Sequence, residues 1–129
     1  MDYFDYNQAF DVKSFLEKSR KRQQERIDRE LQRIEEQLEQ RESLHTESID
    51  ELESKLDWYI ERLEDLYRRS FDTSEEAEKV KDRIEEFYRE IRIEKRKRWQ
   101  DRQKLQRERR ELLRERSQVD LDEWVEELL

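Results

Sequence analysis

The sequence contains no glycine, no proline and no cysteine among its 129 residues. Tight turns and hairpins depend on glycine, asparagine or aspartate at positive φ, and an average chain of this length carries roughly nine glycines and six prolines. A β-sandwich, a barrel and a doubly wound α/β fold are therefore not expected. This composition favours long helices with few breaks.

The absence of cysteine excludes disulfide bonds, thiolate catalysis and cysteine-based zinc sites. No run approaches the ~18 apolar residues that span a bilayer. Residues 1–5 lack the basic region and apolar core of a signal peptide. We therefore expect a soluble, intracellular protein of the cytoplasm with no membrane partner.

Charge is what the sequence has in excess. Asp, Glu, Lys and Arg make up 51% of the residues, the net charge is −8, and only 32% of the residues are hydrophobic. Such a chain cannot build a thick globular core, and high charge also occurs in disordered chains. Leucines and aromatic residues recur here at regular spacing, however, so we expect one ordered domain over residues 1–129.

Apolar residues alternate three and four positions apart, as at the a and d positions of a coiled coil. The three series are Ile27, Leu31, Ile34 and Leu38; His45, Ile49, Leu52, Leu56, Tyr59, Leu63 and Leu66; and Ala77, Val80, Ile84, Phe87 and Ile91, followed by Leu105, Leu112 and Val119. The step of 11 residues from Leu38 to Ile49 is a four-residue stutter, which unwinds a coiled coil locally without ending the helix.

The clearest break lies at residues 70–74, where Asp72 or Thr73 can cap a new helix and Thr73 with Glu76 matches a capping box. A weaker signal is Ser117 with Asp120. These signals predict a helix over 7–70, a turn over 71–73, a helix over 74–117 and a terminal amphipathic helix over 118–128, which either stands alone or continues the second helix.

If the turn lies at 71–73, the residue numbers of any two residues that face each other across the antiparallel helices add to about 143. The apolar residues obey this rule in the pairs Leu66–Ala77, Leu63–Val80, Tyr59–Ile84, Leu56–Phe87 and Leu52–Ile91, and approximately in Leu38–Leu105 and Leu31–Leu112. The sequence therefore predicts an all-α fold, a long antiparallel helical hairpin of the coiled-coil type. The same pairing between two chains, in a swapped dimer, is the alternative.

Charge supports the same register. Segment 92–116 has a net charge of +7 and its partner 27–51 has −6, while segment 18–26 has +4 and its partner 117–125 has −3. A single surface ion pair contributes only about 0–1 kcal/mol. Charge therefore selects the pairing, because slipped or parallel arrangements bring like charges together.

The half next to the turn has more apolar side chains than a two-helix seam uses. The additional ones are Trp58, Ile60, Tyr67, Phe71 and Tyr88. A second copy can cover them by dimerising into a four-helix bundle at the turn end, and a different protein can dock there; we favour the homodimer. Trp58 follows Leu56 by two residues, so it points away from the seam. Because tryptophan is enriched in interface hot spots, it is the best single contact candidate.

The two ends mix apolar residues with acids. Residues 1–16 include Tyr3, Phe4 and Phe15, and residues 119–129 include Leu121, Trp124, Val125 and Leu128 among five acids. Both resemble amphipathic segments that fill a partner's groove, and Tyr3, Phe4, Trp124 and Leu128 are the contact candidates. Alternatively the ends pack on each other, with Phe15 opposite Leu128.

The middle of the hairpin is polar where it continues the heptads. Glu94, Arg98, Asp101, Glu108 and Glu115 fall at core positions. A buried unpaired charge is costly, so this stretch is expected to be open, solvated or covered by a partner. Leu44 and Trp99 face each other in the register and are expected to form an isolated apolar patch.

A basic run over 95–98 suggests contacts with nucleic-acid phosphates, made by Arg96, Arg98, Arg102, Arg109 and Arg110. The negative net charge and the complementary opposite arm disfavour this interpretation and favour a solvated, ion-paired face. Glu42-x-x-His45 has the spacing of a di-iron bundle motif, but it occurs once and faces Arg98. We expect no metal and no cofactor.

Enzyme activity is not expected, because two helices enclose no pocket and the sequence has no phosphate loop or nucleophile elbow. The sequence predicts a non-catalytic coiled-coil structural or adaptor protein that mediates protein–protein assembly. Two alternatives remain: a nucleic-acid-associated protein that uses the basic 92–116 arm, and an acidic inhibitor or regulator that docks on a larger enzyme or nucleic-acid machine.

Overall fold

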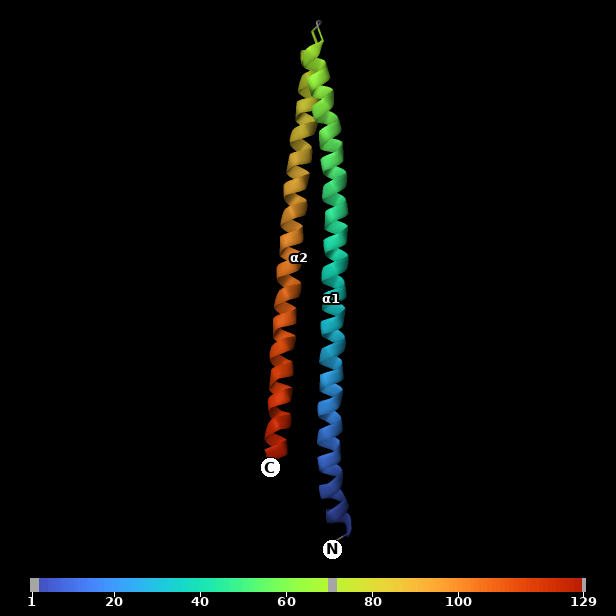
Figure 1. The fold of residues 1–129 in the computed structure, drawn as a ribbon, viewed down its shortest axis with the longest axis vertical. Coiled ribbons are helices and arrows are strands. Elements are labelled where there is room, and N and C mark those ends of the chain that lie inside the picture. The colour runs from blue at the N-terminus through green and yellow to red at the C-terminus, as the bar shows by residue number, and fades with distance from the viewer. Residues whose placement is uncertain (1–2, 70–71, 129) are drawn as a thin grey trace. The chain divides into compact units, whose positions relative to one another are not determined.

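The structure, a computed structural model, describes the backbone of residues 3–69 and 72–128 and the side chains within these ranges from residue 12 onward. These residues form two helices, α1 (Tyr3–Arg68) and α2 (Ser74–Leu128), and no strand (Figure 1). The chain divides into two compact units: unit 1 contains Met1–Gln37 and Leu105–Leu129, and unit 2 contains Leu38–Lys104. In each unit α1 and α2 pack against each other in antiparallel directions, which confirms the predicted all-α helical hairpin.

At the turn, Asp72 caps α2 as predicted, but the Thr73 hydroxyl makes a different hydrogen bond from the predicted one. The Asp72 carboxylate accepts a hydrogen bond from the Ser74 backbone N–H at 3.0 Å, at the start of α2. The Thr73 hydroxyl, predicted to accept in a capping box, instead donates to the Leu66 carbonyl at 3.0 Å. The last carbonyls of a helix have no partner within the helix, so Thr73 satisfies one at the end of α1. That end is Arg68, two residues before the predicted one.

α1 is longer at its outer end than the sequence predicted, and α2 takes the second of the two predicted alternatives, in which segment 118–128 continues the helix. α1 begins at Tyr3 instead of residue 7, because nothing in 3–7 breaks a helix and Asp5 suits the positive N-terminal end of the dipole. α2 continues without a break to Leu128. The Ser117 hydroxyl donates to the Leu113 carbonyl at 3.0 Å, so it bonds within its own helix and does not cap a new one at 118.

The core of unit 2 confirms the predicted register. Leu56, Phe87 and Ile91 are buried in one cluster, against which Leu52, Tyr59, Ile60 and Ile84 pack. The Phe87 ring lies 5.3 Å from the Tyr59 ring, and the Arg83 guanidinium stands 4.6 Å from the centre of the Phe87 ring. Leu66 and Ala77, the predicted pair nearest the turn, are both buried.

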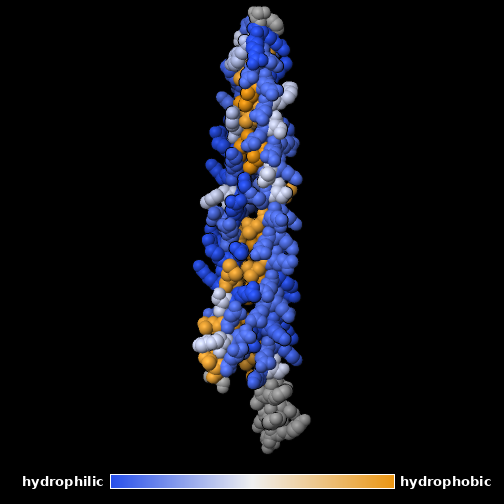
Figure 2. Space-filling model, in the orientation of Figure 1, coloured by the Kyte–Doolittle hydropathy of each residue, from blue (hydrophilic) through white to orange (hydrophobic). Residues whose placement is uncertain are grey.

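Unit 1 has a smaller core bordered by ion pairs. Ile27, Leu31 and Val119 are buried together, with Leu112 packed against them. The flanking ion pairs are Asp28–Arg116 at 2.7 Å, Arg26–Glu115 at 3.1 Å and Glu35–Arg109 at 3.8 Å. In each pair the two residue numbers add to within two of 143, the sum that the predicted register requires. In Figure 2 the apolar side chains on the visible face gather in separate patches with hydrophilic residues between them.

Candidate functional site

A polar cluster occupies the seam of unit 2 where the heptads lose their apolar residues. His45 of α1 lies between two carboxylates of α2: its Nδ1 is 2.6 Å from Glu94 Oε1, and its Nε2 is 3.0 Å from Asp101 Oδ2. The His45 side chain is only 12% exposed. Both ring nitrogens therefore face acceptors, an arrangement that the doubly protonated imidazolium satisfies with two donated hydrogen bonds.

The neighbouring charges of the cluster are also paired. Arg98 donates two hydrogen bonds to the Glu42 carboxylate, and Arg102 donates a third at 3.0 Å. Arg41 lies 3.0 Å from the second oxygen of Asp101. The expectation that this stretch is open or solvated is wrong for Glu94, Arg98 and Asp101, which are half-buried and paired across the helices. Glu115, at the far end of the stretch, is exposed and binds Arg26. Within the described residues no buried side-chain N or O atom lacks a hydrogen-bond partner.

The cluster sets the direction of three pKa shifts. Burial lowers the pKa of His45, but the hydrogen bonds and negative charges of Glu94 and Asp101 outweigh burial, so the pKa is raised. The hydrogen bond from His45 lowers the pKa of Asp101, with a further contribution from Arg41. The hydrogen bonds from Arg98 and Arg102 lower the pKa of Glu42.

The raised pKa of His45 predicts a pH-dependent stability. Since the pKa in the folded chain lies above the unfolded value of about 6.5, the stabilisation is complete below that value and is lost as the pH rises through the folded-state pKa. We expect urea unfolding followed by circular dichroism to give a lower free energy of unfolding at about pH 8.5 than at about pH 6. His45 is the only histidine, so His45→Gln removes this difference. An unchanged difference in the variant would contradict the role of the cluster.

The additional apolar residues of unit 2 lie on two flanks of the hairpin. Lys81 stands 5.4 Å from the centre of the Tyr67 ring, so these two side chains share a flank. Ile60 lies seven residues before Tyr67 and Tyr88 lies seven after Lys81, which places both on the same flank. Tyr67 and Tyr88 are exposed, and Ile60 is half-buried. We call Ile60, Tyr67 and Tyr88 the turn-end flank.

Trp58 lies away from the turn-end flank. It precedes Ile60 by two residues, or about 200° of helix rotation. Trp58 is exposed and makes an edge-to-face contact with Tyr59, 4.8 Å between ring centres. The structure thus separates Trp58 from the other candidates of this half. Phe71 lies outside the described residues, and so do the side chains of Tyr3 and Phe4.

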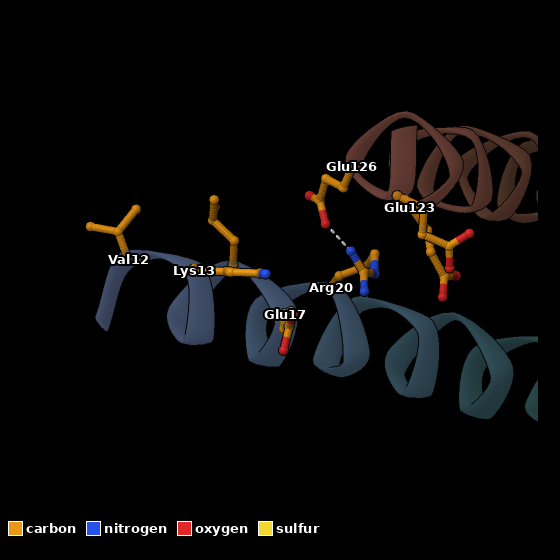
Figure 3. A pocket seen from close by; sticks show the side chains of 8 residues that line it. Val12, Lys13, Glu17, Arg20, Glu123 and Glu126 are labelled. Atoms are coloured by element: carbon orange, nitrogen blue, oxygen red, sulfur yellow. Dashed lines mark hydrogen bonds and ion pairs between the residues drawn. The ribbon is translucent and has the colours of Figure 1, made fainter. Parts of the chain in front are cut away.

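Unit 1 contains an open groove of about 600 Å³ near the ends of the chain. Val12 and Leu16 of α1 supply apolar lining, and the other lining residues are Lys13, Glu17 and Arg20 of α1 with Glu123, Glu126 and Glu127 of α2 (Figure 3). Arg20 donates a hydrogen bond to Glu126 across the groove. Four of the six charged lining residues are acidic, so the groove suits a basic ligand better than an acidic one.

Two expected apolar contacts are absent among the described side chains. Phe15 and Leu128 are 65% and 66% exposed, so the ends do not bury each other. Leu44 and Trp99 are also both exposed, and they form no covered patch. None of these four residues occupies an a or d position of the heptads that the buried residues define. The sum of residue numbers shows which residues lie at the same level of the two helices, but not whether their side chains point into the seam.

The basic candidates differ in their surroundings. Arg98 and Arg102 bind Glu42, and Arg109 lies 3.8 Å from Glu35. Arg96 and Arg110 are exposed. Three of the five arginines therefore already have carboxylate partners on α1, which reduces their availability for phosphates.

The described residues thus form an all-α helical hairpin with a thin apolar seam, a paired polar cluster and exposed apolar side chains. Among the described residues no group of three or more His, Asp or Glu residues is placed to hold a metal ion. Neither helix, over the same residues, contains a stretch long and apolar enough to cross a membrane.

The chain belongs to DUF8104, a family of unknown function, whose match covers residues 1–129. Comparisons with curated proteins and with solved structures gave no match.

Proposed function

We propose that this chain is a non-catalytic coiled-coil assembly protein whose turn-proximal unit pairs with a second copy into a four-helix bundle. The turn-end flank is the observation that carries the proposal. Tyr67 and Tyr88 each leave about half or more of their surface exposed, next to the partly covered Ile60. Two helices bury their a and d residues between themselves, and covering a flank beside that seam requires a third and a fourth helix.

A second copy fits this flank because it supplies the same apolar side chains by symmetry. Most homodimers are two-fold symmetric, so one patch serves as both halves of the interface. Aromatic side chains bury 150–250 Å² each, which makes Tyr67 and Tyr88 the main contributors to association. Trp58, on the other flank, is then available to a different protein, in keeping with an adaptor role.

The test uses thiol labelling, since the chain has no cysteine of its own. Tyr88→Cys places a thiol on the turn-end flank, and Ile93→Cys places a matched control five residues later on α2. Both native side chains are 47% exposed. We expect the maleimide labelling rate of the Tyr88→Cys variant to fall several-fold as the protein concentration rises, while the Ile93→Cys variant reacts at a constant rate. Because Tyr88→Cys removes one of the two rings, labelling is followed to concentrations well above those at which the wild-type chain associates. Equal, concentration-independent rates there would count against pairing through this flank.

A further inference from the structure

The last two turns of α2 carry an apolar face that the hairpin does not use. Leu121, Trp124, Val125 and Leu128 occupy positions i, i+3, i+4 and i+7, the spacing of one helix face. Their exposed fractions are 51%, 56%, 44% and 66%. Val119, the preceding apolar residue, is buried against α1. The seam therefore ends at Val119, and the apolar residues that follow lie elsewhere on the helix.

This face points away from α1. Leu121 follows the buried Val119 by two residues, or about 200° of rotation. The side of α2 toward α1 is occupied instead by acids: Glu123 accepts a hydrogen bond from Gln24 at 3.2 Å, and Glu126 accepts one from Arg20. These turns thus keep their polar side toward α1 and their apolar side outward, the reverse of a helix whose apolar side covers its own core.

The residues around the face carry one sign of charge. Segment 118–128 contains five acids and no basic residue. The last turn of α2 has no basic residue, although the C-terminal end of a helix dipole is negative and is stabilised by cations. Cations supplied by a partner would relieve both the mutual repulsion of the acids and their unfavourable place on the dipole.

Segment 18–26 of α1 is basic, but two-fold pairing of two copies through this face would bring the face against its own acids and would not supply those cations. The groove of unit 1 is lined by Glu17, Glu123, Glu126 and Glu127 against Lys13 and Arg20. The apolar face of a second copy is surrounded by the same five acids. Charge complementarity therefore points to a different protein with a basic rim.

We propose that Leu121, Trp124, Val125 and Leu128 insert as an amphipathic helix into an apolar groove of another protein, and that Lys and Arg residues on the rim of that groove pair with the acids of segment 118–128. Helix-in-groove recognition uses the same i, i+3, i+4 and i+7 anchors. The inference rests on the proposed assembly function and specifies the partner class for segment 118–128 of unit 1.

The probe is a fluorescein-labelled helical peptide of leucine and lysine, with leucines at i, i+3, i+4 and i+7, which presents an apolar stripe with a basic rim. The control peptide has glutamate in place of lysine. We expect anisotropy titrations of the full-length chain to show saturable binding of the lysine peptide only. The double variant Leu121→Ala/Leu128→Ala should weaken that binding about tenfold or more.

Leu44→Ala/Leu113→Ala is the matched variant, since it removes two exposed leucines outside segment 118–128; its affinity should equal that of the wild type. Absence of binding, equal binding of both peptides, or equal losses in the two double variants would overturn the proposal. It would also be overturned if Leu121→Ala/Leu128→Ala abolished self-association, because the occupant would then be a second copy. Thiol labelling at residue 88 reports on the turn-end flank alone, so either proposal can fail while the other stands.

Discussion

Phe87→Ala is expected to lower the free energy of unfolding by about 3 kcal/mol. The ring is 2% exposed, packs with Leu56 and Ile91, and contacts the Tyr59 ring and the Arg83 guanidinium. Its removal takes away the largest buried side chain of the unit 2 cluster and leaves a cavity that two helices can close only in part. Urea unfolding followed by helical circular dichroism measures the loss.

The adjacent residue provides the control for this substitution. Tyr88→Ala removes a ring of similar size from the turn-end flank, outside the seam. At protein concentrations below self-association we expect its free energy of unfolding to change by no more than about 0.5 kcal/mol. If the two variants lost equal stability, the assignment of Phe87 to the seam and of Tyr88 to the flank would be wrong.

The heptad spacing was sufficient to predict the helices and their register. Leu56 and Phe87 were paired from residue numbers alone and lie in one buried cluster. Two helix ends depended on single hydroxyl groups: Ser117 can cap a helix or bond within one, and Thr73 can accept or donate. Sequence spacing does not decide between these states, because a hydroxyl can accept from a backbone N–H at a helix start or donate to a backbone carbonyl.

The polar cluster was only partly predictable. The heptad placed Glu94, Arg98 and Asp101 at core positions, but the register assigned Arg98 to His45, whereas Arg98 binds Glu42 and His45 lies between the two carboxylates. Long side chains reach a full turn along the seam, and the stutter shifts the phase of α1, so residue sums do not identify partners there. One feature of the sequence pointed to the ion pair between Arg41 and Asp101. In the predicted register, Arg41 lies one residue from the position that faces Asp101.

Arg98→Glu is the second substitution with a large expected effect, a loss of about 2 kcal/mol in the free energy of unfolding. It removes both hydrogen bonds to Glu42 and places a third carboxylate of α2 in a seam that already holds Glu94 and Asp101. The pair is about one-third exposed, so solvent screening keeps the loss below that of a fully buried ion pair. Urea unfolding at neutral pH and low salt is the measurement.

Arg96→Glu is the control, because it makes the same change of charge on an exposed position of α2. Its effect should stay within about 0.5 kcal/mol. Adding Glu42→Arg to Arg98→Glu should recover part of the loss by restoring an opposite pair, although Arg102 then faces a like charge. Equal losses for Arg96→Glu and Arg98→Glu would indicate that net charge matters and that the cluster does not.

The side chains of this hairpin fall into two groups: those that hold the two helices together, and exposed apolar ones that are available for association. Residues of the seam and of the polar cluster hold α1 and α2 in one register. Tyr67 and Tyr88 of the turn-end flank, Trp58 and the outward face of the last turns of α2 are exposed and contribute little to that packing. We therefore expect substitutions on these surfaces to change association at constant helicity, which is the behaviour of an assembly protein.

Sedimentation equilibrium of the wild-type chain measures whether two copies pair through the turn-end flank. We expect a concentration-dependent mass that rises toward twice the 16.5 kDa of one chain. Combining Tyr67→Ala and Tyr88→Ala should weaken this rise and leave the helicity unchanged. A mass of one chain at every concentration would contradict assembly through the turn-end flank.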